Sequence, residues 1–138
     1  MIEKLRDFLA TDEGRKASEE FWAKIQREDE RKIKSKEYLV SISKPKLDKL
    51  IFRLIEDNGD EWRDKCWKNR YQPYPTNLMC LLFDGAIAGG KESRESLKSK
   101  GYFSESVVKF RGYYFSRVYG QGVIFSIFNS KKEEIFSI

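Results

Sequence analysis

The sequence predicts an α+β fold in which about five helices in residues 1–104 precede a three-stranded antiparallel β-meander in residues 105–138. We expect the meander to pack on the helices within a single domain, residues 1–138. Helical spacing and capping residues recur through the first two thirds of the chain. Ten of the twenty Phe, Tyr and Trp residues lie between Tyr102 and Phe136. A chain of 138 residues, 40% apolar and 36% charged, has the size and composition of one globular domain.

Two helices are predicted at the start of the chain. The first is short and follows from the helical spacing of Ile2, Leu5, Phe8 and Leu9. Thr11 is a favourable N-cap for the second, because two acidic residues follow it in the first turn. The residues expected on the inner face of the second helix are Ala17, Phe21, Trp22 and Ile25. Residues 27–34 are nearly all charged and predict a solvent-exposed helix face.

The middle of the chain begins with a short apolar patch at residues 38–42, which predicts either a strand or a packed connector. Ser43 is then expected to cap a helix that has Pro45 near its first turn. The apolar residues of this helix recur at i, i+3, i+4, i+7 and i+8 and are Leu47, Leu50, Ile51, Leu54 and Ile55. Asn58-Gly59 ends the pattern.

Two more helices are predicted before the strands. Asp60 is expected to cap one that continues to about Arg70, and prolines 73 and 75 then predict a short rigid loop. A compact helix follows Thr76, with Leu78, Leu81, Leu82, Gly85 and Ala86 along one side. Gly89-Gly90 predicts its end. Residues 91–100 predict a polar loop.

The three strands of the meander are predicted at residues 107–119, 123–129 and 134–138. Gly120-Gln121-Gly122 supplies a tight turn between the first two, and residues 129–133 supply a longer one. The middle strand is apolar on both faces, so we expect it to be central in the sheet.

The composition excludes several classes of chemistry. The chain has no histidine, which removes Ser-His-Asp and Cys-His catalysis and histidine metal sites. Residues 85–91 fit the GxxxxGK part of a phosphate-binding loop, but Glu92 stands where a hydroxyl would be needed. A helix that ends in glycine explains this segment more simply. We therefore expect no catalytic residue, metal or cofactor.

The cysteines and the apolar runs bear on the location of the protein. Cys66 and Cys80 are fourteen residues apart without a CxxC spacing, so we expect two free thiols in a reducing compartment. The first residues lack the apolar core of a signal peptide, and no apolar run is long enough to span a membrane. The expected location is cytoplasmic, without a membrane partner.

Aromatic and basic side chains mixed around residues 62–74 predict a protein interface, because Trp, Tyr and Arg anchor such interfaces. The residues of this predicted interface are Trp62, Trp67, Arg70, Tyr71 and Tyr74. The alternative is that the proline-containing loop covers them. The leading functional hypothesis is a non-catalytic binding protein whose partner is another protein or a second copy of the chain.

The second hypothesis is sequence-tolerant binding of single-stranded nucleic acid by the strand predicted at residues 107–119. One face of that strand would carry alternating basic and aromatic side chains, which are Lys109, Arg111, Tyr113, Phe115, Arg117 and Tyr119. Aromatic rings can stack on bases while Lys and Arg neutralise phosphates. The alternative is that these aromatic residues pack against the helices. With a net charge of only +5, the composition does not require an anionic partner.

Overall fold

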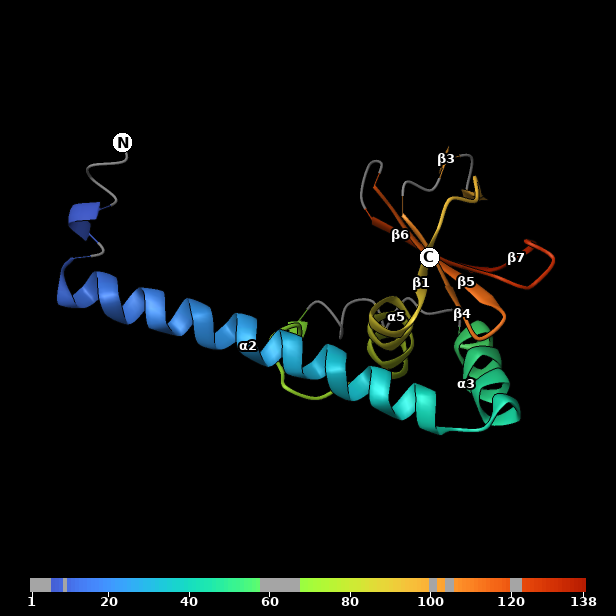
Figure 1. The fold of residues 1–138 in the computed structure, drawn as a ribbon, viewed down its shortest axis with the longest axis horizontal. Coiled ribbons are helices and arrows are strands. Elements are labelled where there is room, and N and C mark those ends of the chain that lie inside the picture. The colour runs from blue at the N-terminus through green and yellow to red at the C-terminus, as the bar shows by residue number, and fades with distance from the viewer. Residues whose placement is uncertain (1–5, 9, 58–67, 100–101, 104–105, 120–122) are drawn as a thin grey trace.

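The computed structural model of the protein describes residues 6–8, 10–57, 68–99, 102–103, 106–119 and 123–138. Among them helices come first and strands follow, which confirms the α+β class (Figure 1). The helices are α2 (Asp12–Ser41), α3 (Lys44–Glu56) and α5 (Leu78–Gly89). The strands are β1 (Lys91–Ser93), β2 (Lys98–Ser99), β3 (Tyr102–Phe103), β4 (Val107–Phe110), β5 (Tyr113–Tyr119), β6 (Val123–Phe128) and β7 (Glu134–Ser137).

Helix α2 has 30 residues, which corresponds to a length of about 45 Å. Thr11 caps it as predicted, and its hydroxyl oxygen accepts a hydrogen bond from the Gly14 N–H at 3.0 Å. The strand or connector expected at residues 38–42 is wrong, because the helix continues through Ser41. Leu39 lies four residues after Ser35 on one helix face, and both are buried, so packing supports the helix to its last turn.

Helices α3 and α5 form where their caps and apolar spacing predict them. The Ser43 hydroxyl accepts a hydrogen bond from the Lys46 N–H at the start of α3. The N-cap of α5 is Asn77, and its side-chain oxygen accepts from the Cys80 N–H at 2.9 Å. Gly90 follows the last residue of α5 as its C-cap, so the glycine pair ends this helix.

Helices α2 and α5 approach each other closely at Gly85. A Cβ atom added at this glycine would lie 2.6 Å from Cδ1 of Leu39 and 2.8 Å from the Ser35 carbonyl oxygen. Only glycine permits that separation without a shift of backbone. Gly85 therefore sets how closely the C-terminal half of α2 packs on α5.

The main sheet has five antiparallel strands in the order β1-β4-β5-β6-β7, so the prediction of three strands is too low. β1 comes from the segment predicted as a polar loop, and it pairs with β4 at the edge of the sheet. Its residues are polar and largely exposed, so the alternation that identifies a half-buried strand is absent.

The strand predicted at residues 107–119 is in fact a hairpin of β4 and β5. Arg111 and Gly112 join the two strands with backbone φ angles of 46° and 89°. Positive φ at both central residues is the geometry of a type I′ turn, which twists to match the flanking strands. Arginine is an unusual first residue for this turn, so the sequence signal was weak.

Both faces of the sheet are covered. On one face, Phe110, Phe115, Ile127 and Phe136 join the buried residues of α3 and α5 in the main core. On the other face, Leu97 packs with Val107, Tyr114 and Phe128 in a smaller cluster. β2 and β3 pair with each other beyond this second face, on the side away from the helices (Figure 1). The meander is therefore an internal layer of the molecule.

Two predicted helices lie partly or largely outside the described residues. Of the helix expected at residues 2–9, only residues 6–8 are described, and they are helical. Most of the helix expected from Asp60 to Arg70 lies outside them. No helix in the described part of the chain is both long and apolar enough to cross a membrane.

Cys80 is disulfide-bonded, so the expectation of a free thiol at this position is wrong. The other cysteine of the chain, Cys66, lies outside the described residues. Cys80 is buried in the first turn of α5. The disulfide therefore holds α5, the helix that packs against both α2 and the sheet.

We expect Cys80 to resist N-ethylmaleimide in the unfolded, non-reduced protein and to be alkylated after reduction, as read by peptide mass mapping. Loss of a structural disulfide typically costs about 2–4 kcal/mol, so reductant should lower the melting temperature toward that of Cys80→Ser. Alkylation of Cys80 without reductant, or an unchanged melting temperature, would contradict this expectation.

Candidate functional site

The single basic and aromatic strand face predicted for nucleic acid does not form. Lys109 pairs with Tyr114 across the β4–β5 hairpin, whereas Phe110 pairs with Tyr113. Paired residues share a face and neighbours along a strand alternate, so Lys109 lies on the opposite face from Tyr113, Phe115 and Arg117. Phe115 is also 0% exposed. These residues therefore do not share one exposed strand face, because a two-residue turn divides them and the helices cover Phe115, and nucleic-acid binding by the exposed members stays a prediction.

The Arg111 side chain connects this turn to the end of α2. Its Nη1 donates hydrogen bonds to the carbonyl oxygens of Leu39 at 2.8 Å and Ile42 at 2.7 Å. These carbonyls lie at the C-terminal end of α2, where no further helical N–H is present to bond them. The arginine joins the β4–β5 turn to α2. The side chain of Tyr119, another predicted residue, lies outside the described ones.

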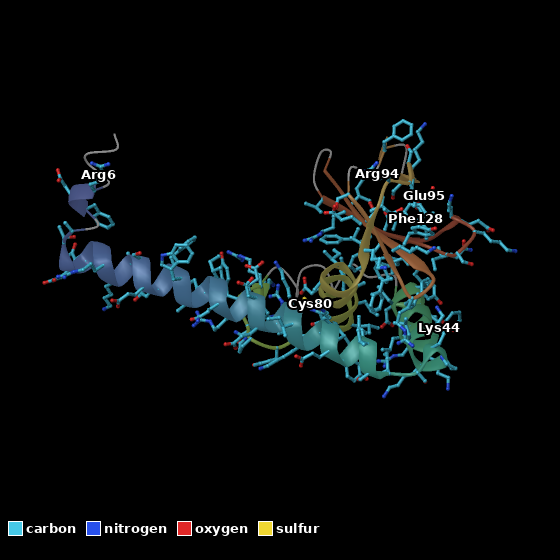
Figure 2. The ribbon with its side chains drawn as sticks, viewed as in Figure 1. Arg6, Lys44, Cys80, Arg94, Glu95 and Phe128 are labelled. Carbon is cyan, nitrogen blue, oxygen red and sulfur yellow. The ribbon has the colours of Figure 1, made fainter. Side chains whose placement is uncertain are left out.

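Tyr113 bonds to α3 through its hydroxyl, which donates to Asp48 Oδ1 at 2.5 Å. Burial raises the pKa of the Tyr113 phenol to about 12, and the hydrogen bond to Asp48 and its charge add to the effect. The Lys44 ammonium lies 4.1 Å from the centre of the Tyr113 ring and 3.4 Å from Asp48 Oδ1. Figure 2 labels Lys44 beside α3. These contacts fix α3 to the sheet.

A shallow apolar depression lies next to this cluster, between α3 and the sheet. It encloses about 680 Å³ and is lined by Ile51, Phe52, Ile55, Tyr113 and Ile135, with charged residues of α3 beside them. Phe52 is exposed and its ring forms part of the wall. The volume of the depression lies within the range of ligand clefts, but its lining is mostly apolar and offers few polar groups to orient a small ligand.

Of the predicted protein interface, Trp62 and Trp67 lie outside the described residues. Tyr71 lies against the middle of α2, where its carbonyl oxygen accepts from Arg27 Nε at 3.1 Å. The Lys24 ammonium is 5.6 Å from its ring centre, and the guanidinium of Arg70 is 4.8 Å from it. Tyr74 is exposed. The described members thus form a turn beside α2, and their role in binding stays a prediction.

The charged segment of α2 contains a buried ion pair, which the prediction of a solvated face missed. Arg31 Nε lies 2.9 Å from Asp84 Oδ2 of α5, and the two side chains are 6% and 14% exposed. The same guanidinium donates to the carbonyl oxygens of Asn69 and Arg70. Burial raises the pKa of Asp84, and the charge and hydrogen bond of Arg31 act against that rise. Arg31 therefore joins α2, α5 and the turn after residue 68.

The N-terminal half of α2 extends well beyond α5 (Figure 1). α5 has 12 residues and α2 has 30, so α5 is about 18 Å long and can cover less than half of α2. Figure 2 shows the side chains of the uncovered half projecting both above and below the helix. Phe21 and Trp22, predicted on the inner face, are both exposed there. That prediction is wrong, because no described element reaches them.

A straight row of apolar side chains runs along α2 at its solvent surface. Its members are Trp22, Ile33 and Val40, which are 63%, 55% and 57% exposed. They are 11 and 7 residues apart, so at about 100° per residue they point within about 20° of one another. The row lies about 100–160° around the helix from Ser35 and Leu39, which pack on α5. We call Trp22, Ile33 and Val40 the outer stripe.

The outer stripe differs from the scattered apolar residues that any surface carries, because its members align over about 27 Å of one helix. Its spacing is visible in the sequence, but the sequence predicts Trp22 on the inner face with Phe21. The position of α5, which decides the inner face, comes only from the tertiary structure. No group of three Cys, Asp or Glu side chains in the described ranges could hold a metal.

No protein-family model matches the chain, and no curated protein or solved structure is significantly similar to it.

Proposed function

We propose that the chain is a non-catalytic binding protein that recognises another polypeptide through the outer stripe of α2. The observation that supports this proposal is the alignment of Trp22, Ile33 and Val40, each more than half exposed, on the side of α2 away from α5. An aligned apolar row on a helix is the pattern that packs against a second helix or into a groove. Trp is also among the residues that most often dominate binding energy.

The energetics favour a partner of modest affinity. Full burial of an apolar side chain of this size is worth about 1.5–3 kcal/mol, and three side chains are about half exposed. A partner that covers them therefore gains roughly 3 kcal/mol from this chain alone. Arg70 and Tyr71 lie against a different side of α2, beside Lys24 and Arg27. They are not part of the proposed surface.

A cytoplasmic location, expected from the sequence, is part of the proposal and has its own consequence. Disulfides are rare in that compartment, where thiols are kept reduced. A cytoplasmic protein should therefore have a reduced Cys80 in the cell and an oxidised one after purification in air. Rapid alkylation in intact cells tests this location. A modified Cys80 would support the cytoplasm, and an unmodified Cys80 would indicate an oxidising compartment.

A photo-reactive amino acid tests the proposed surface directly. We expect p-benzoylphenylalanine in place of Ile33 to form polypeptide adducts on irradiation, in cell extract or in concentrated purified protein. The matched control places the same group at Lys34, which is exposed but points about 100° away around the helix. Adducts from position 33 should exceed those from position 34 several-fold. Equal yields, or none in either sample, would contradict the proposal.

A further inference from the structure

We propose that the polypeptide bound by the outer stripe is a second copy of this chain, whose α2 packs antiparallel to the first. This inference rests on the proposed function and specifies its partner. Two-fold dimers are the commonest assemblies of identical chains, and each surface residue then contributes twice. The surface must therefore be complementary to itself, and α2 meets that requirement in three ways.

The first is the placement of charge beside the outer stripe. Asp29 and Lys36 are exposed and lie on the same flank of the stripe, seven residues apart. In an antiparallel pair related by a two-fold axis, a flank meets the same flank of the partner. An axis midway between these two residues places Asp29 opposite Lys36 of the partner, and Lys36 opposite the partner's Asp29. The positions of Asp29 and Lys36 therefore give two ion pairs in the dimer.

The second is that the same axis also matches the apolar residues. Ile33 lies half a residue from the midpoint between Asp29 and Lys36, so it meets the partner's Ile33 within about 1.5 Å along the helix. Val40 lies as far after that midpoint as Ile25 lies before it. Val40 therefore faces Ile25 of the partner, which is half-buried in the single chain. One register therefore satisfies these charged contacts together with those of Ile33 and Val40, whereas Trp22 lies opposite position 43 of the partner, beyond its α2.

The third is the overall charge of α2, which favours the antiparallel orientation. In the part of α2 that overlaps the partner in this register, residues 24–30 carry three acidic and two basic side chains, whereas residues 31–41 carry one acidic and four basic side chains. An antiparallel pair directs the acidic part of each helix toward the basic part of its partner. It also opposes the two helix dipoles. A parallel pair would place like charges together.

The outer stripe itself is left exposed in the single chain. α5 packs near Ser35 and Leu39, about 100–160° around α2 from the stripe, and a Cβ atom added at Gly89 of α5 would lie 3.1 Å from Cγ of Lys36 on the flank. A partner helix can therefore lie on the stripe while α5 keeps its place. Three apolar residues per copy make a small interface of the kind that gives transient complexes. We expect a dissociation constant of order 10–100 µM.

Charge reversal at the two facing positions tests the register. In sedimentation-velocity runs over roughly 10–500 µM, which bracket that constant, the native protein should approach twice its 16.3 kDa mass. Asp29→Lys and Lys36→Asp should each weaken association about tenfold or more, because each places two pairs of like charges together. An equimolar mixture of the two variants should associate again, because every facing pair is then opposite. The double variant D29K/K36D should also associate.

Controls separate pairing from folding. Lys34→Asp reverses a charge on the same helix but off this surface, so it should leave association unchanged. The melting temperature of each variant, measured at low concentration, reports whether the fold is intact. A native protein that stays monomeric throughout the range would overturn the inference, as would single variants that associate normally or a mixture that fails to recover.

The photo-reactive group at position 33 distinguishes failure of this inference from failure of the proposed function. Self-pairing predicts an adduct of twice the monomer mass in purified protein alone, with the link joining position 33 to residues around Ile33 of the second copy. A monomeric purified protein whose extract adduct contains a different polypeptide would overturn self-pairing and support the proposed function. Absence of both adducts would overturn both.

Discussion

Replacing Phe115 with alanine is expected to lower the free energy of unfolding by about 3–5 kcal/mol, the usual cost of deleting a buried phenylalanine side chain. Phe115 is 0% exposed, and its ring packs edge-on against Phe83 of α5 at a centroid distance of 5.5 Å. It lies where the central strand β5 meets the helices. Alanine would leave a cavity at that junction, because neither layer can collapse without displacing the other.

Urea unfolding monitored by circular dichroism measures this loss. Phe52→Ala is the matched control, because Phe52 is 59% exposed on α3 and its removal should change the free energy by no more than about 0.5–1 kcal/mol. The comparison also decides whether Phe115 packs against the helices or lies on an exposed binding face. A Phe115→Ala variant of native stability would mean that the residue is not in the core.

Replacing Arg31 with methionine is the second substitution with a large expected effect, again about 3–5 kcal/mol of unfolding free energy. Methionine fills similar space but leaves Asp84 buried without its ion-pair partner, and two backbone carbonyls lose a donor. The double variant R31M/D84L removes both charges and should recover part of the loss. Arg15→Met breaks a solvent-exposed pair with Asp12 and should have an effect near zero.

The effect of Arg31→Met should depend on pH in a defined direction. Burial raises the folded-state pKa of Asp84 above its usual 3.8. The folded protein thus binds this proton more readily than the unfolded chain, so stability from this group is full below pH 3.8 and declines as pH rises through the folded pKa. Removing Arg31 raises that pKa further. The deficit of the variant should therefore be largest at neutral pH and smaller near pH 4.

Unfolding curves of the native protein and Arg31→Met at the two pH values test this sign. A deficit that is the same at both would show that Asp84 does not change protonation over the range. A deficit that grows on acidification would contradict the lowering of the Asp84 pKa by Arg31.

Local signals in the sequence were sufficient for α3 and α5. Ser43 and Asn77 begin these helices, glycine follows α5, and the spacing of Leu47, Leu50, Ile51 and Leu54 marks the buried face of α3. Capping and helical periodicity act within a few residues, so they are visible without the fold. The number of strands is not visible in the sequence, because β1 is an exposed edge strand and the Arg111-Gly112 turn lacks the usual Asn or Asp.

For the predicted binding surfaces, too, the sequence shows which residues are present and the fold decides which of them are exposed. The mixture of basic and aromatic residues after Tyr102 was a correct reading of composition, but the hairpin sends Lys109 and Phe115 to opposite faces. The alignment of Trp22, Ile33 and Val40 was already present in their spacing. Its significance depends on α5, which covers Leu39 and leaves those three side chains exposed.

The sequence by itself determined the α+β class, the start of α2, α3 and the end of α5, because these depend on neighbouring residues along one helix. Only the tertiary structure decided that Arg31 is buried against Asp84, that Phe115 belongs to the core and that α2 extends past its support. Each of these depends on which segment, distant in the chain, lies against a given side chain. Burial is a property of that pairing, and residue type alone does not determine it.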